Sequence, residues 1–137
     1  MTYYDQGSYA PANYATALIE FQKVIDVYPT SPYVDNAWFY IGRTHHQKGG
    51  AVELATARTT YMDVIATFPP SVYADNALYY FAKTFHDEGN CTLELSAMQG
   101  FLKAYPNSYY ATFAQTHIAE ISGGSTSPTW TPHGCVN

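Results

Sequence analysis

Charged residues are scarce in this 137-residue chain, at 12% of the total, and basic residues are the scarcest, with six Lys and Arg against eleven Asp and Glu. Nucleic-acid binding depends on clustered Lys and Arg, so the net charge of −5 argues against a nucleic-acid partner. A weakly charged surface also gives little repulsion between copies of a protein. The composition therefore favours association with other proteins or with further copies of the same chain.

Long apolar runs and catalytic motifs are missing as well. No run approaches the ~20 apolar residues of a membrane-spanning helix, so we expect no membrane span. Gly-rich phosphate loops, nucleophile elbows and paired catalytic carboxylates are absent, and we expect a protein that is not an enzyme and holds no cofactor. His45 and His46 do not predict a metal site, because adjacent helical residues point about 100° apart whereas zinc-binding pairs are spaced i, i+4.

Cysteines are few and no leader segment is visible. Residues 1–10 show neither the basic nor the apolar segment of a signal peptide. The two cysteines, Cys91 and Cys135, are too few to decide the redox compartment. A disulfide between them, within one chain or between two chains, would contribute a few kcal/mol, roughly 2–4. Two free thiols are the alternative.

Prolines and glycines divide the chain into segments in which apolar residues recur at helical spacing. Asn13, Ser31 and Ser108 are candidate helix N-caps, and Asn90 fits a cap better than the glycosylation acceptor that Asn90-Cys91-Thr92 also matches. The sequence predicts an all-α fold of about six or seven helices and no sheet. The expected segments are 14–27, 32–48, 53–67, 72–88, 92–104 and 109–121. The inward face of the second is expected to run through Tyr33, Ala37, Trp38, Tyr40, Ile41, Thr44 and His45.

One nine-residue stretch occurs three times in the chain. Pro29–Ala37 returns as Pro69–Ala77 and, more loosely, as Pro106–Ala114. The spacing between copies is 40 and then 37 residues. Repetition with a period of about 20–50 residues is typical of stacked repeat proteins.

The aromatic and small residues within each period resemble those of tetratricopeptide repeats. That family has an aromatic residue or Leu followed by Leu-Gly on the first helix of each pair, and Ala, then Phe or Tyr, then Pro on the second. The residues that fit are Trp38, Ile41, Gly42, Ala57, Tyr61 and Pro69, then Leu78, Phe81, Ala82, Met98, Phe101 and Pro106, and, as the second half of an earlier unit, Tyr14, Ala17, Phe21 and Pro29. The Tyr-Pro-x-Ser-x-Tyr-Ala junction is similar to the bacterial envelope subset, which includes the lipoprotein of the β-barrel assembly machinery and the periplasmic coordinator of the Tol–Pal system.

The resemblance covers residues 13–121 and implies a right-handed α-solenoid of antiparallel helix pairs, about three units that are incomplete at both ends. Residues 1–12 would then be an N-terminal arm or partial helix, and residues 122–137 an extended C-terminal tail. Glu94 stands where the family has a small Ala. We therefore expect that helix pair to be splayed or locally wet.

The family binds peptides in a groove lined by its first helices, which implies a set of groove residues here. Arg43 and Lys83 share one repeat position and are weakly similar to the clamp that holds a peptide's terminal carboxylate in some members. The alternative is that these positions form a solvated helix face. The positions expected to face the groove are Asn36, Phe39, Arg43, His46, Gln47, Asn76, Tyr79, Lys83, His86 and Asp87.

The ends of the array favour self-association. A repeat stack buries its core only by stacking neighbours, and a soluble monomer needs polar caps at both ends. Here the last helix is apolar, so we expect head-to-tail contacts that propagate into a filament. The alternative is that residues 1–12 and the tail fold back as caps. The expected contact residues are Tyr14 and Phe21 at one end, and Tyr109, Tyr110, Phe113, Ile118, Ile121 and Trp130 at the other.

Two functions are consistent with these patterns. The leading hypothesis is a non-enzymatic scaffold that forms an extracellular or cell-surface filament, in which the tail fastens subunits through Trp130 and Cys135. The alternative is a monomeric adaptor of the bacterial envelope, located in the periplasm, that holds a peptide through Arg43, Lys83 and neighbouring aromatic residues. An enzyme that uses Cys91 with a nearby histidine is a third, weakly supported reading.

Overall fold

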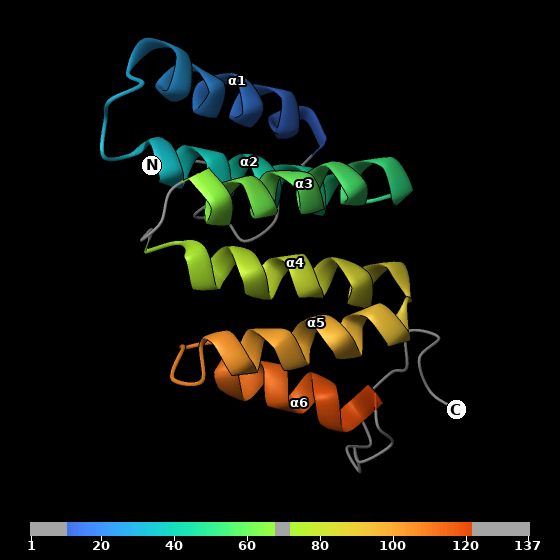
Figure 1. The fold of residues 1–137 in the computed structure, drawn as a ribbon. Helices are drawn as coiled ribbons and strands as arrows, with labels where there is room; N and C mark the ends of the chain where they lie inside the picture. The colour runs from blue at the N-terminus through green and yellow to red at the C-terminus, as the bar shows by residue number, and fades with distance from the viewer. Residues whose placement is uncertain (1–10, 68–71, 122–137) are drawn as a thin grey trace.

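The computed structural model of the chain describes residues 11–67 and 72–121 (Figure 1). These residues form helices and connecting turns and contain no strand, which confirms the all-α prediction for this part of the chain. No helix in it combines the length and the hydropathy required to cross a membrane. The helices are α1 (Pro11–Val27), α2 (Val34–Lys48), α3 (Ala51–Thr67), α4 (Ala74–Glu88), α5 (Cys91–Ala104) and α6 (Ala111–Ile121).

Each helix packs chiefly against the helices that precede and follow it in the sequence, and α2 also touches α4. Figure 1 shows the resulting stack, with α1 at one end and α6 at the other. The core is correspondingly a row of three clusters. Their buried members are Ala17, Phe21, Ala37 and Ile41, then Phe39, Ala57, Tyr61, Val64 and Ala77, and finally Tyr79, Ala82, Met98, Phe101 and Ala114.

Several helix starts differ from the predicted ones. The amide of Tyr33 donates to Ser31 Oγ at 3.1 Å, and the amide of Tyr110 donates to Ser108 Oγ at 3.1 Å. These serines therefore close a turn, and the helix begins after it, at Val34 and at Ala111. Asn13 is not a cap, because α1 already begins at Pro11. The prediction for Asn90 is confirmed, since its side chain accepts a hydrogen bond from the amide of Leu93 at 3.2 Å.

Gly42 allows α2 and α3 to approach closely. A Cβ atom at this position would lie 2.6 Å from Cε1 of Tyr61. The Tyr61 side chain is fully buried between α2 and α4, so its ring has little freedom to move away. The Tyr61 ring therefore explains why position 42 holds a glycine, since no larger side chain fits beside it.

Replacing Gly42 with Ala should destabilise the fold by about 1–3 kcal/mol, because an added methyl group overpacks the α2–α3 contact. Gly100 is the matched control, since it is exposed in α5 and a Cβ there would meet nothing within 4 Å. Gly100→Ala should stabilise by about 0.5–1 kcal/mol through the higher helix propensity of Ala. Urea unfolding of both variants checks the pair, and equal effects would contradict this account of Gly42.

Candidate functional site

Arg43 and Lys83 lie together on one face of the stack. A hollow of about 390 Å³ brings Arg43 and His46 of α2 next to Tyr80, Lys83 and Asp87 of α4. A second hollow of about 510 Å³ places the same arginine and lysine beside aromatic side chains. The second hollow is lined by Arg43, Tyr79, Tyr80, Lys83, Tyr109, Tyr110 and Phe113. Both cations therefore border both hollows.

The Arg43 side chain is held by a ring and keeps one donor unused. Its guanidinium carbon lies 4.1 Å from the centre of the Tyr80 ring, a cation–π contact that fixes the side chain in place. The Nε atom of Arg43 is buried and has no hydrogen-bond partner among the described residues. A buried donor without a partner is energetically costly, which makes this atom a candidate contact for an acceptor on a ligand.

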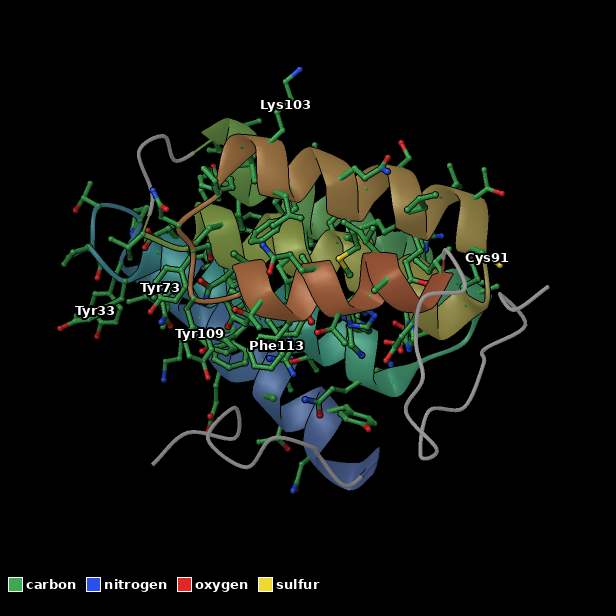
Figure 2. The ribbon with its side chains drawn as sticks, turned by 90° about the horizontal axis from the view of Figure 1, so that it is seen from below. Tyr33, Tyr73, Cys91, Lys103, Tyr109 and Phe113 are labelled. Carbon is green, nitrogen blue, oxygen red and sulfur yellow. The ribbon has the colours of Figure 1, made fainter. Side chains whose placement is uncertain are left out.

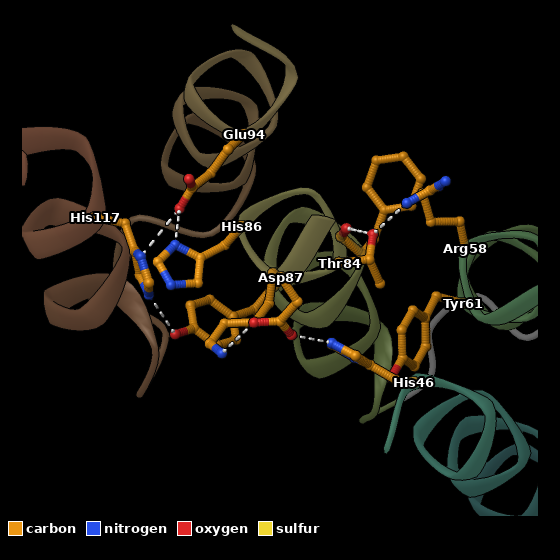
Figure 3. A network of polar contacts seen from close by, with 11 residues as sticks. His46, Arg58, Tyr61, Thr84, His86, Asp87, Glu94 and His117 are labelled. Carbon is orange, nitrogen blue, oxygen red and sulfur yellow. Dashed lines mark hydrogen bonds and ion pairs between the residues drawn. The ribbon is translucent and has the colours of Figure 1, made fainter. Parts of the chain in front are cut away.

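His46 and Asp87 connect two helices that are not sequence neighbours (Figure 3). His46 Nε2 lies 2.6 Å from Asp87 Oδ2, and its Nδ1 lies 3.1 Å from the Tyr61 hydroxyl. Lys83 Nζ lies 3.4 Å from the other Asp87 oxygen. Burial alone would raise the pKa of Asp87, but the hydrogen bond to His46 and the charge of Lys83 outweigh it and hold the pKa below its ordinary value. The contact thus joins α2 to α4 directly.

Two of the predicted groove residues are in the core instead. Phe39 is 1% exposed and Tyr79 is also buried, so Phe39 cannot contact a partner where it lies, and Tyr79 offers only an edge to the second hollow. Asn36 is engaged within the protein, because its amide nitrogen lies 2.5 Å from the Tyr73 hydroxyl. Asn76 and Gln47 are half-buried. Of the predicted groove set, the residues that line the first hollow are Arg43, His46, Gln47, Lys83 and Asp87.

The repeated junctions place one tyrosine at the same position before α2, α4 and α6. Before α4, Tyr73 stacks on Phe39 of the preceding repeat, with ring centres 5.5 Å apart. Before α6, Tyr110 stacks on Tyr79 at 4.6 Å. Tyr33, before α2, is 68% exposed, and no helix precedes α1 among the described residues. Figure 2 shows Tyr33 on the same side of the molecule as Tyr73 and Tyr109.

The predicted self-association residues divide into buried and exposed groups. Phe21 packs inward against α2, and Tyr110 is covered in part by Tyr79, so neither forms an open end. Tyr14 is half-buried and donates to the Gln47 carbonyl at 3.3 Å. Ile118 packs on the last core cluster and Ile121 is half-buried.

At the α6 end, the exposed members are Tyr109, at 78%, and Phe113, at 47%. Their rings lie 5.7 Å apart. Trp130 and Cys135 lie outside the described residues. Cys91 is disulfide-bonded.

Sequence reasoning missed a polar cluster that contains Glu94. This residue is not wet as expected but completely buried, at 0% exposure, between His86 of α4 and His117 of α6. Burial alone would raise the pKa of Glu94, but contacts with His117 and His86 outweigh it and hold the pKa below its usual value. The signal in the sequence was Glu94 itself, since a glutamate at a small-residue position requires partners. Nothing in the spacing identified His86 and His117 as those partners.

No protein-family model matches this chain, and no curated protein matches it significantly.

The His46–Asp87 contact should contribute about 0.5–1 kcal/mol at neutral pH, because Asp87 is partly exposed and solvent screens the pair. Asp87→Asn should lose this contribution, whereas Asp63→Asn, an exposed change on α3, should not. Since the folded pKa of Asp87 lies below its ordinary value of 3.8, the contribution is complete above that pH and is lost as the pH falls through the folded value. Thermal melts between pH 2 and 7 test this, and a D87N deficit that persists at pH 2 would contradict it.

Proposed function

We propose that this chain is a non-enzymatic scaffold of the tetratricopeptide-repeat kind, a right-handed solenoid of antiparallel helix pairs that assembles head to tail into a filament. The packing of each helix on its neighbours in sequence supports the solenoid. In this reading α2, α4 and α6 are the first helices of successive units, and α1, α3 and α5 are second helices. Within residues 11–121 the array therefore begins with half a unit and ends with half a unit.

The observation that carries the proposal is the exposed ring of Tyr33. Its equivalents, Tyr73 and Tyr110, each stack on an aromatic residue of the preceding unit. Tyr33 occupies the same junction position but has no preceding first-type helix among the described residues. Tyr28 and Tyr105 support this comparison as well, since each stands just before the proline that begins a copy of the repeated stretch. Tyr28 is exposed, whereas Tyr105 packs against the last core cluster.

The α6 end of a second copy offers a surface on which Tyr33 could pack. Counted from the junction tyrosine, Phe113 aligns with Asn36 and Asn76, and Thr116 aligns with Phe39 and Tyr79. A second copy placed in continuation of the stack brings its Tyr33 over Phe113 and Thr116 of the first copy. It also brings α1 against α6, as α5 lies against α4.

Such a contact joins the α6 end of one copy to the α1 end of the next, so a dimer still has one free α1 end and one free α6 end. Further copies can therefore add, unless the rotation between successive copies closes a ring. A filament of this type suits a chain with few charges, because repulsion between subunits is small. We place it outside the cell or on its surface, since the disulfide at Cys91 is typical of oxidising compartments. The tail, through Trp130, would fasten neighbouring subunits.

Tyr33→Asp and Phe113→Asp should each abolish polymer formation, because a charge buried at the contact costs about 2 kcal/mol or more, or about 30-fold in Kd. Val52→Asp is the control, since Val52 is exposed on α3 away from both ends. Negative-stain microscopy and light scattering under oxidising conditions should show filaments for the unaltered chain and V52D only.

Mixing the two defective variants gives a sharper test. Each retains one intact end, so Y33D and F113D together should form a dimer of one chain of each kind and nothing longer. A monomeric unaltered chain at high concentration, or filaments from either variant, would exclude this assembly.

A second candidate is peptide binding by Arg43 and Lys83, as in the envelope adaptors that the sequence resembles. The unused Nε donor of Arg43 and the two hollows beside it favour this function. A carboxylate placed there would accept charge-assisted hydrogen bonds from both cations.

We expect the R43M/K83M double variant to lose at least about tenfold in affinity for a carboxylate-terminated peptide, since each charge-assisted hydrogen bond contributes about 1.5–3 kcal/mol. The peptide of residues 122–137 is a suitable ligand, measured by fluorescence anisotropy with a free and with an amidated C-terminus. Lys103→Met, an exposed change on α5, is the control. Equal binding by the acid and the amide, or no effect of the double variant, would rule out the carboxylate contact.

A further inference from the structure

Three helices bring two imidazoles and one carboxylate to a single point near the α6 end (Figure 3). His86 Nδ1 of α4 lies 2.9 Å from Glu94 Oε2 of α5, and His117 Nδ1 of α6 lies 3.1 Å from the same oxygen. The two rings meet edge to face with their centres 4.7 Å apart. All three candidate ligand atoms lie within 4.8 Å of one another.

The burial of this cluster is unusual for its charge. Glu94 is 0% exposed and both histidines are largely covered. Buried carboxylates are retained in proteins when they are paired with cations or coordinate metal ions. Nδ1 of His117 is buried and lies 3.1 Å from Oε2 of Glu94, and His86 Nδ1 approaches the same oxygen from the other helix. Two imidazole nitrogens therefore meet at one buried carboxylate oxygen.

A divalent metal ion would explain why two imidazole nitrogens and one carboxylate oxygen converge on a buried point. Two nitrogens and one carboxylate oxygen make a donor set that suits Zn²⁺, with a fourth position left for water or another ligand. Calcium and magnesium prefer oxygen ligands. With metal–ligand bonds of about 2.0–2.1 Å, tetrahedral ligand atoms lie about 3.3 Å apart. The two nitrogen–oxygen pairs here, at 2.9 and 3.1 Å, are a few tenths of an ångström closer, and all three atoms lie within 4.8 Å of one another. Side-chain adjustments would therefore admit an ion.

The surroundings of His117 match a metal ligand. If Nδ1 coordinates the ion, the ring proton resides on Nε2, and Nε2 lies 3.4 Å from the Tyr79 hydroxyl. Ligand histidines commonly donate this second N–H to a polar group that fixes the ring orientation.

We propose that His86, Glu94 and His117 form a binding site for one Zn²⁺ ion that fastens α6 to α4 and α5. The site is independent of filament formation, because its ligands come from a single chain. Binding of the ion to the folded chain alone stabilises the fold by mass action. The ion also restrains α6, the helix that carries Phe113.

Zinc titration of the full-length, chelator-treated chain without an affinity tag tests the site. Isothermal calorimetry at pH 7 should show one ion per chain, and the melting temperature should rise with zinc concentration. His86→Gln, Glu94→Gln and His117→Gln should each weaken binding by at least about tenfold. Cobalt in place of zinc should give the visible absorption of a tetrahedral site, and H117Q should remove it.

His45→Gln is the matched control, because His45 also pairs with a glutamate, Glu53, at 2.5 Å, but there Lys48 is the third partner at 3.0 Å. This variant should bind zinc as the unaltered chain does. Circular dichroism of the metal-free variants shows whether each has folded, and H86Q and H117Q keep the test decisive if E94Q does not. No stoichiometric binding, or an equal loss in H45Q, would overturn the proposal.

Discussion

Burial between neighbouring helices is the constraint on which this structure depends. The described residues have no single central core but three buried clusters, and in each cluster side chains of one helix pack against the next helix. Tyr61 is the clearest case, since its ring fills the space that Gly42 leaves in α2 and also approaches Phe39 and Tyr80. Among the described residues α1 and α6 each pack chiefly against a single neighbouring helix, and Tyr33 at one end and Phe113 at the other are exposed.

The contacts between units are mainly aromatic, with a few histidine–carboxylate pairs. Stacked rings such as Tyr79 and Tyr110 join successive units with little charge, which agrees with the low charged fraction of the sequence. The polar links, His46 with Asp87 and the Glu94 cluster, lie where two or three helices meet. Stacking of uncharged rings can hold helices together within one chain, and the same type of contact can join two copies of the chain.

The sequence was sufficient for the helices but not for every face. Prolines and glycines predicted where the helices end. Ser31 and Ser108 were expected to cap the following helices, but each accepts a hydrogen bond within the turn before the helix, because a serine side chain stabilises a turn as readily as a helix start. Trp38, Phe39 and Tyr40 are consecutive, and periodicity alone cannot decide which of three aromatic neighbours faces inward. The structure buries Phe39, because Tyr61 and Ala77 lie opposite it. The partners of Glu94 were out of reach, since they lie on other helices.

The attachment of α6 shows why the Glu94 cluster matters. The buried residues of α6 are Ala111 and Ala114, and two alanines bury little apolar surface. The helix is also held by Ile118 on the last core cluster, by the Tyr79–Tyr110 stack just before its start, and by His117 further along. The contacts of His86 and His117 with Glu94 join α6 to α4 and α5 at one point. The stability of this last helix, and of any surface that it presents to another chain, therefore depends on one buried carboxylate and its two imidazoles as well as on apolar packing.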